Sequence, residues 1–247
     1  MAENNGNGWH LTDIKSESLQ QMLMIIDFVS LNMQNAFQTG PTNIPDISGQ
    51  MAVAITGSTI DLETGKASST TATNGATTRT SSNNGQCSIT YRGVENPYGN
   101  LWRFVDGIQI DEGYYYKISE GNDIISLNFK APTASGWISR FGYDERKDWL
   151  FLPIEVNSDN ANSNLPVGDY LYSREDTAQV NCCIIGGYSN SKENSGIFYY
   201  GLNLPYENYH YQSDSARVMF KPTADSEIEG TNYDLWYNTY FVTDMMM

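Results

Sequence analysis

Short strand signals separated by turn residues fill the chain from about residue 100 onward. Runs rich in aromatic and β-branched residues alternate there with glycine, asparagine, aspartate and proline, which is the pattern of strands joined by turns. Helical periodicity is absent from this region beyond one turn near residues 93–99. We therefore expect a mainly β (α+β) fold. The expected strands are Leu101–Ile110, Tyr114–Ile118, Ile124–Phe129, Trp149–Pro153, Tyr170–Tyr172, Gln179–Ile185, Gly196–Leu204, Ala216–Phe220 and Tyr233–Val242.

Two segments of this region carry a joint pattern. The first, Tyr91–Ile108, contains the run Gly-Asn-Leu-Trp at residues 99–102, and the second extends from the glycine doublet Gly186-Gly187 to Phe220. Together they resemble the C-type-lectin-like fold in the version used by phage surface proteins and the variable adhesins of diversity-generating elements. The formylglycine-generating enzyme family shares that framework. The resemblance covers residues 87–221 and implies one compact domain with a loop-built binding face.

The remaining segments differ in composition, which suggests a division of the chain. Glycine and proline mark the end of a predicted helix near residue 40, and a Ser/Thr/Gly-rich tract that cannot bury much apolar surface follows it. The expected parts are a flexible arm (1–12), a helix (13–38), a linker with polar loops (39–86), the C-type-lectin-like domain (87–221) and a C-terminal extension (222–247) with an added edge strand or a subunit contact.

Apolar residues of the predicted helix recur at alternating spacings of three and four, so they lie on one seam like that of a coiled coil. Other apolar residues lie off the seam, so the helix has more apolar surface than one packing face needs. The helix can pack on its own domain, or it can serve docking or oligomerisation, which we favour. The seam residues are Leu19, Met22, Ile26, Val29 and Met33.

Charge and hydropathy exclude two classes of partner. The chain has 29 acidic and 14 basic residues, a formal net charge of -15, and it has no run of lysine and arginine. We therefore expect no nucleic-acid partner. The longest apolar stretch, Met22–Ile26, is too short for membrane insertion. Because neither a basic nor an apolar leader segment follows Met1, we expect synthesis in a host cytoplasm.

Catalytic and metal-binding patterns are weak. The resemblance to the formylglycine-generating family implies paired cysteines after the glycine doublet, but Cys182 and Cys183 precede it and no cysteine follows. The two histidines, His10 and His210, lie in no recognisable catalytic motif. Metal-ligand spacings are also missing. We therefore expect free thiols, no enzymatic activity, no catalytic residues, no metal and no cofactor.

The stretch between the glycine doublet and the last expected strand of the domain is rich in tyrosine and asparagine. The resemblance implies that adhesins display contact residues here, and tyrosine with asparagine suits adaptable binding surfaces and glycans. These tyrosines could equally pack against a neighbouring subunit or fill loops. The candidate ligand-binding residues are Tyr188, Asn190, Tyr200, Tyr206, Asn208, Tyr209, His210 and Tyr211.

These observations lead to one functional expectation. The resemblance implies a structural protein of a bacteriophage virion, a head fibre or capsid decoration, that presents a C-type-lectin-like face to a host-surface glycan or protein. The N-terminal segment would dock on capsid or other virion proteins and form a homo-oligomer, for which we expect a trimer. The alternatives are a tail-associated receptor-binding adhesin and a purely structural decoration.

Overall fold

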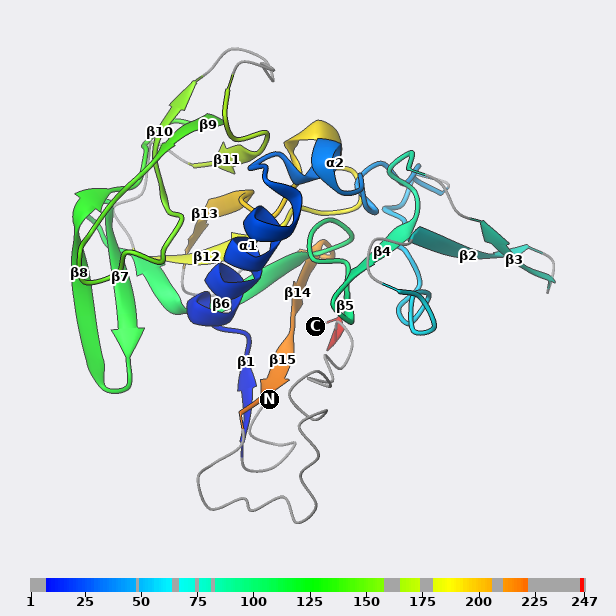
Figure 1. Cartoon of the computed structure of the whole chain (residues 1–247), viewed down its shortest axis with the longest axis horizontal. Coiled ribbons are helices and arrows are strands. Elements are labelled where there is room, and N and C mark those ends of the chain that lie inside the picture. The colour runs from blue at the N-terminus through cyan, green and yellow to red at the C-terminus, as the bar shows by residue number, and fades with distance from the viewer. Residues whose placement is uncertain are drawn as a thin grey trace.

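The fold is described from a computed structural model (Figure 1). The structure describes residues 8–47, 49–63, 67–73, 76–80, 83–157, 165–173, 180–205, 211–221 and 245–246. Over these residues the chain is mainly β, with a curled sheet. The helices are α1 (Ile14–Phe28), α2 (Met33–Ala36) and the 3-10 turn η2 (Lys192–Asn194). The strands are β1 (Trp9–Leu11), β2 (Ala67–Thr73), β3 (Ala76–Thr80), β4 (Ser88–Tyr91), β5 (Val94–Glu95), β6 (Trp102–Ile110), β7 (Tyr115–Glu120), β8 (Asp123–Lys130), β9 (Gly136–Phe141), β10 (Pro153–Asn157), β11 (Tyr170–Tyr172), β12 (Asn181–Ile185), β13 (Tyr200–Pro205), β14 (Asp214–Ala216), β15 (Val218–Phe220) and β16 (Met245–Met246).

The main sheet is arranged around β6. Its strand order is β10-β9-β11-β13-β12-β6-β14-β16, and the β7–β8 hairpin also pairs with β6. β14 runs parallel to β6 and β11 runs parallel to β13, whereas the other pairs are antiparallel. α1 lies across one face of this sheet, while β2 and β3 belong to a small separate sheet that projects to the side (Figure 1).

The two segments that carry the sequence pattern meet in this sheet, as predicted. β14, which belongs to the second segment, pairs in parallel with β6 and places Ser215 opposite Arg103. Beyond the strands, the Gly99 N–H donates to the Gly186 carbonyl over 2.9 Å. Gly186 has a φ of +98°, and a Cβ atom there would lie 2.8 Å from Nη1 of Arg103. The glycine doublet is therefore needed partly because Arg103 occupies the space beside it.

α1 turns a largely polar side toward the sheet. Its N-terminus is capped by Asp13, whose carboxylate accepts a hydrogen bond from the Ser16 N–H over 2.9 Å. Amphipathic helices normally bury an apolar stripe. Most of the buried side chains of α1 are polar instead, so hydrogen bonds help to fix the orientation of the helix on the sheet. The buried residues of α1 are Ile14, Glu17, Ser18, Gln21 and Met24.

The prediction of one continuous helix over residues 13–38 is wrong. α1 ends before Val29, which adopts a left-handed conformation with a φ of 51°. The Asn32 side chain then caps the short helix α2. Asparagine and serine here offer the backbone local hydrogen bonds that compete with a continuing helix. The break brings the Phe37 ring back onto Phe28, with ring centroids 4.7 Å apart.

Several other boundaries also differ from the prediction. β1 lies inside the arm predicted to be flexible and pairs with β15, and the predicted linker contains the β2–β3 hairpin. β9 was not predicted, and β10 begins where the predicted strand Trp149–Pro153 ends. Ser/Thr-rich strands escape a composition-based prediction because ladder hydrogen bonds come from the backbone and need no apolar side chain. Of the extension 222–247, only residues 245–246 are among those that the structure describes.

Arg103 is a charged group at the centre of the fold. It is the largest fully buried side chain among the described residues, with 1% of its surface exposed. Nη2 lies 3.2 Å from Oε2 of Glu17, also 1% exposed, and donates to the Pro97 carbonyl over 2.8 Å. Nη1 donates to the Asn96 carbonyl over 3.4 Å. The ion pair thus ties α1 to β6 and to the turn before it.

We expect Glu17→Ala to lower the free energy of unfolding by about 3–5 kcal/mol, because it leaves the Arg103 guanidinium buried without its carboxylate. The double variant Glu17→Met/Arg103→Met should be more stable than the single variant, since it removes both charges. Urea unfolding followed by circular dichroism measures both values.

The exposed ion pair between Arg140 and Glu155 provides the matched control, with side chains 66% and 57% exposed. Glu155→Ala should change the free energy of unfolding by less than about 1 kcal/mol. Equal losses for Glu17→Ala and Glu155→Ala would contradict a structural role for the buried pair.

Candidate functional site

The sheet face opposite α1 carries a group of aromatic side chains. Because side chains alternate along a strand, Arg103 points toward α1 while Trp102 and Phe104 point to the opposite side. Trp102 packs there with Tyr199 from the turn before β13 and with Ile184 of β12. We name the following set the aromatic face: Trp102, Phe104, Trp137, Tyr170, Tyr172, Tyr188 and Tyr199.

The rings of the aromatic face form a connected series. Ring centroids are 4.4 Å apart for Trp102 and Tyr199, 6.1 Å for Tyr199 and Tyr170, and 5.4 Å for Tyr170 and Trp137. Burial raises the pKa of Tyr199, and the nearby phenols of Tyr188, Tyr170 and Tyr172 raise it further. Tyr172 is 43% exposed, and Tyr170 and Tyr188 are half-buried. The series therefore extends from a packed centre to phenols that reach the surface.

Residues 95–100 hold two loops, of which 186–191 carries Tyr188 of the aromatic face. The Asn100 carbonyl accepts from the Ser189 N–H over 2.8 Å, and the Asn100 side chain accepts from the Ala54 N–H over 2.7 Å. The Glu95 carboxylate accepts from the backbone N–H groups of Gly57 and Thr59. One short segment thus fastens both the 51–62 loop and the 186–191 loop to the start of β6.

The structure separates the residues predicted to bind a ligand. Tyr188 belongs to the aromatic face, Asn190 is half-buried in the adjacent loop, and Tyr211 is 52% exposed in the turn before β14. The prediction for Tyr200 is wrong, because its side chain is fully buried on the α1 side of β13, where its hydroxyl accepts from Nε2 of Gln21. The other four candidates lie outside the described residues: Tyr206, Asn208, Tyr209 and His210.

Sequence reasoning missed most of the aromatic face. It placed Trp102 and Phe104 in an expected strand without a binding role, and it did not single out Tyr170 or Tyr172 as ligand contacts. An available signal was the alternation in Tyr170–Tyr172, where two tyrosines flank one leucine, because such a strand presents both phenols on the same side. The pairing of Tyr170 with Trp137 could not be foreseen, since β9 was not predicted.

The seam predicted on the N-terminal helix lies mostly on the outer surface of α1. Leu19 is 54% exposed, Ile26 is 70% exposed and Val29 is 88% exposed, whereas Met22 between them is half-buried. We name these four residues the outer stripe. Met33 does not belong to it, because the break after α1 turns this side chain into the core. The remaining seam is an apolar strip that the described part of the chain leaves uncovered.

Metal and nucleophile chemistry receive little support from the residues that the structure describes. Among them, no three histidine, cysteine, aspartate or glutamate side chains gather in a way that could hold a metal ion. Cys87 and Cys183 are buried free thiols, and burial raises the pKa of Cys183. No helix in the described ranges is long and apolar enough to cross a membrane.

Asp169 is a buried carboxyl group behind the aromatic face. Its side chain is fully buried and accepts a hydrogen bond from the Phe198 N–H over 2.7 Å. Its backbone carbonyl accepts from the Ile138 N–H over 3.0 Å. Burial raises the pKa of Asp169 well above its ordinary value. Ionising this carboxyl group is therefore unfavourable in the folded state, and the hydrogen bond from Phe198 offsets only part of the cost of burial.

This shift predicts that Asp169 destabilises the fold as the pH rises. Because its folded pKa lies above the ordinary value of 3.8, its contribution is complete below that pH and is lost as the pH rises through the folded value. Asp169→Asn should therefore gain stability relative to the parent as the pH rises above about 4. Urea midpoints of both proteins across this range measure the effect.

Asp144 supplies a control of opposite sign. The Arg146 guanidinium holds the pKa of Asp144 below its usual range, so its contribution is present above that range and is lost as the pH falls. Asp144→Asn should therefore be less stable than the parent near neutral pH, and this difference should disappear as the pH falls. Parallel pH profiles for the parent and Asp169→Asn would contradict the assignment for Asp169.

Comparison with known proteins leaves the function to be argued from this geometry. A scan against protein-family models found no family that matches the chain, and a search of curated proteins found no matching relative. The C-type-lectin-like relation therefore remains a prediction from the sequence. The features that carry a functional argument are the aromatic face, the loops that residues 95–100 fasten, and the outer stripe of α1.

Proposed function

We propose that this chain is a structural protein of the bacteriophage virion surface, a head fibre or capsid decoration, with a C-type-lectin-like fold that binds a host-surface glycan or protein. In this proposal the chain is a binding module and not an enzyme, and it uses no cofactor. It is made in the host cytoplasm and then assembled on the particle. The observation that carries the proposal is the aromatic face on the side of the sheet opposite α1.

The chemistry of the aromatic face suits recognition. Tyr172 and Tyr188 combine ring area with hydroxyl groups at or near the surface, while Trp102 and Tyr199 form a rigid base beneath them. Aromatic rings with few rotatable bonds give contact area at a low entropic cost, and their hydroxyl groups add hydrogen bonds. The net charge of -15 disfavours polyanionic ligands, so uncharged glycans and protein surfaces are the partners that fit best.

The outer stripe supports the docking part of the proposal. Leu19, Ile26 and Val29 expose apolar surface on the opposite side of the molecule from the aromatic face. A second copy of the chain or a capsid protein that covered this stripe would leave the aromatic face directed outward. We propose homo-oligomerisation through the stripe, with a trimer as the assembly.

Full-length protein should bind bacterial surface glycans on an array, or whole bacterial cells, and Tyr172→Ala and Tyr188→Ala should each weaken binding at least tenfold, about 1.4 kcal/mol. Tyr143→Ala is the matched control, because Tyr143 is 70% exposed but lies outside the aromatic face. No binding by the parent on any sugar or cell, or equal loss in all three variants, would contradict the proposal.

Sedimentation velocity tests the outer stripe. The parent should sediment as an oligomer with three times the chain mass, and Leu19→Gln/Ile26→Gln should sediment as a monomer, because both substitutions place amides in the apolar contact. Ile124→Gln changes a side chain that is 62% exposed on β8 and should leave the assembly intact. A parent protein that is monomeric at every concentration would contradict oligomerisation through the outer stripe.

A further inference from the structure

Gln21 connects α1 to the turn that precedes β13. Its side-chain amide is fully buried, and Nε2 donates to the Ile197 carbonyl over 2.9 Å and to the Tyr200 hydroxyl over 3.0 Å. These two acceptors lie on either side of Tyr199, which points to the aromatic face. A single side chain of the helix therefore holds both ends of the short segment that carries Tyr199.

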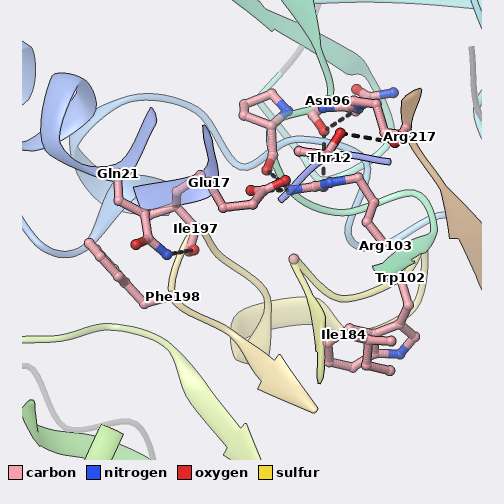
Figure 2. A network of polar contacts seen from close by, with 12 residues as sticks. Thr12, Glu17, Gln21, Asn96, Trp102, Arg103, Ile184, Ile197, Phe198 and Arg217 are labelled. Atoms are coloured by element: carbon pink, nitrogen blue, oxygen red, sulfur yellow. Dashed lines mark hydrogen bonds and ion pairs between the residues drawn. The ribbon is translucent and has the colours of Figure 1, made fainter. Parts of the chain in front are cut away.

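Glu17 makes a second connection from the same side of α1. Its carboxylate pairs with Arg103 over 3.2 Å, and Arg103 directly follows Trp102 in β6. Figure 2 shows Glu17 and Gln21 reaching toward the sheet from the helix, whereas Trp102 packs on Ile184 on the other side of β6. The helix thus contacts the immediate chain neighbour of each ring in the Trp102–Tyr199 pair.

The connections through Glu17 and Gln21 both lead to the contact between Trp102 and Tyr199. The ring centroids of these two residues lie 4.4 Å apart, and the rings form the base of the aromatic face. The glycine doublet lies between the two routes, since a Cβ atom on Gly186 would meet Arg103 and one on Gly187 would meet Tyr199, each at 2.8 Å. Because these groups are buried and in close contact, they offer a path by which a displacement of α1 reaches the ring pair.

We propose that Glu17 and Gln21 are positioning residues for the aromatic face. Through Arg103 and through the 197–200 turn, they set the placement of the Trp102–Tyr199 pair from the opposite side of the sheet. A last step rests on the proposed function. A partner that docks on the outer stripe of α1 adjusts the binding face through the inner side of the same helix. Docking and ligand binding are then coupled by the buried polar contacts of these two side chains.

The test compares Gln21→Met with Ser18→Ala. Methionine has nearly the shape of glutamine but donates no hydrogen bond, whereas Ser18 is equally buried on α1 and the structure shows no hydrogen-bond partner for its hydroxyl among the described residues. Amide hydrogen exchange at Phe198 should accelerate about 5- to 30-fold in Gln21→Met and remain near the parent rate in Ser18→Ala. The β7–β8 amides serve as the reference for global unfolding and should not change.

The second readout is specific to the opposite face. The fluorescence of Trp102, obtained by subtracting the spectrum of the matching Trp102→Phe protein, should change in wavelength and in acrylamide quenching in Gln21→Met. Glu17→Gln, which keeps the shape of Glu17 without its charge, should produce a change of the same kind even if Gln21→Met folds poorly. Ser18→Ala should leave the Trp102 signal unchanged.

An unchanged Trp102 signal in both folded variants would overturn the proposal, as would acceleration of exchange at Phe198 and at the β7–β8 amides by the same factor. Neither measurement uses a ligand. A protein that binds no glycan or cell but shows these changes would refute the proposed function while leaving the positioning roles in place. A protein that binds a glycan or a cell but shows neither change would refute the positioning roles and leave the proposed function in place.

Discussion

A guanidinium group taken out of water needs acceptors around it, and most of this architecture is arranged to supply them to Arg103. The carboxylate comes from α1, and the carbonyl groups come from the turn at residues 96–97. The glycine doublet leaves the necessary space. Because a buried charge without partners costs several kcal/mol, the contacts of Arg103 couple the stability of the helix to that of the central strand and the turn before it.

The local features of the fold could be predicted from the sequence, and the long-range ones could not. β6 was found because its alternation is visible in the chain, and the cap at Asp13 follows from residue type. Glu17 reads as a surface residue until Arg103 is placed beside it, 86 residues away. In the same way, neighbouring tyrosines look alike in sequence, and only pairing with β12 decides that Tyr200 faces the helix.

The two sides of the sheet differ in chemistry, and the proposed function assigns docking to one side and recognition to the other. The α1 side holds the main apolar core together with the polar contacts of Glu17 and Gln21, while the aromatic contacts on the opposite side extend to partly exposed rings. Tyr172 and Tyr188 can therefore change with little effect on the core, whereas Tyr199 and Trp102 cannot. The prediction for Tyr200 was wrong because composition does not show which side of a sheet a ring occupies.

The pairing of β1 with β15 has a consequence for biosynthesis. The Thr12 hydroxyl donates to the Arg217 carbonyl, 205 residues further along the chain. At ribosomal rates of roughly 5–20 residues per second, that partner emerges about 10–40 seconds after the first strand. Until then β1 lacks its partner strand, so the pairing that joins the N-terminal strand to the rest of the fold closes only late in synthesis.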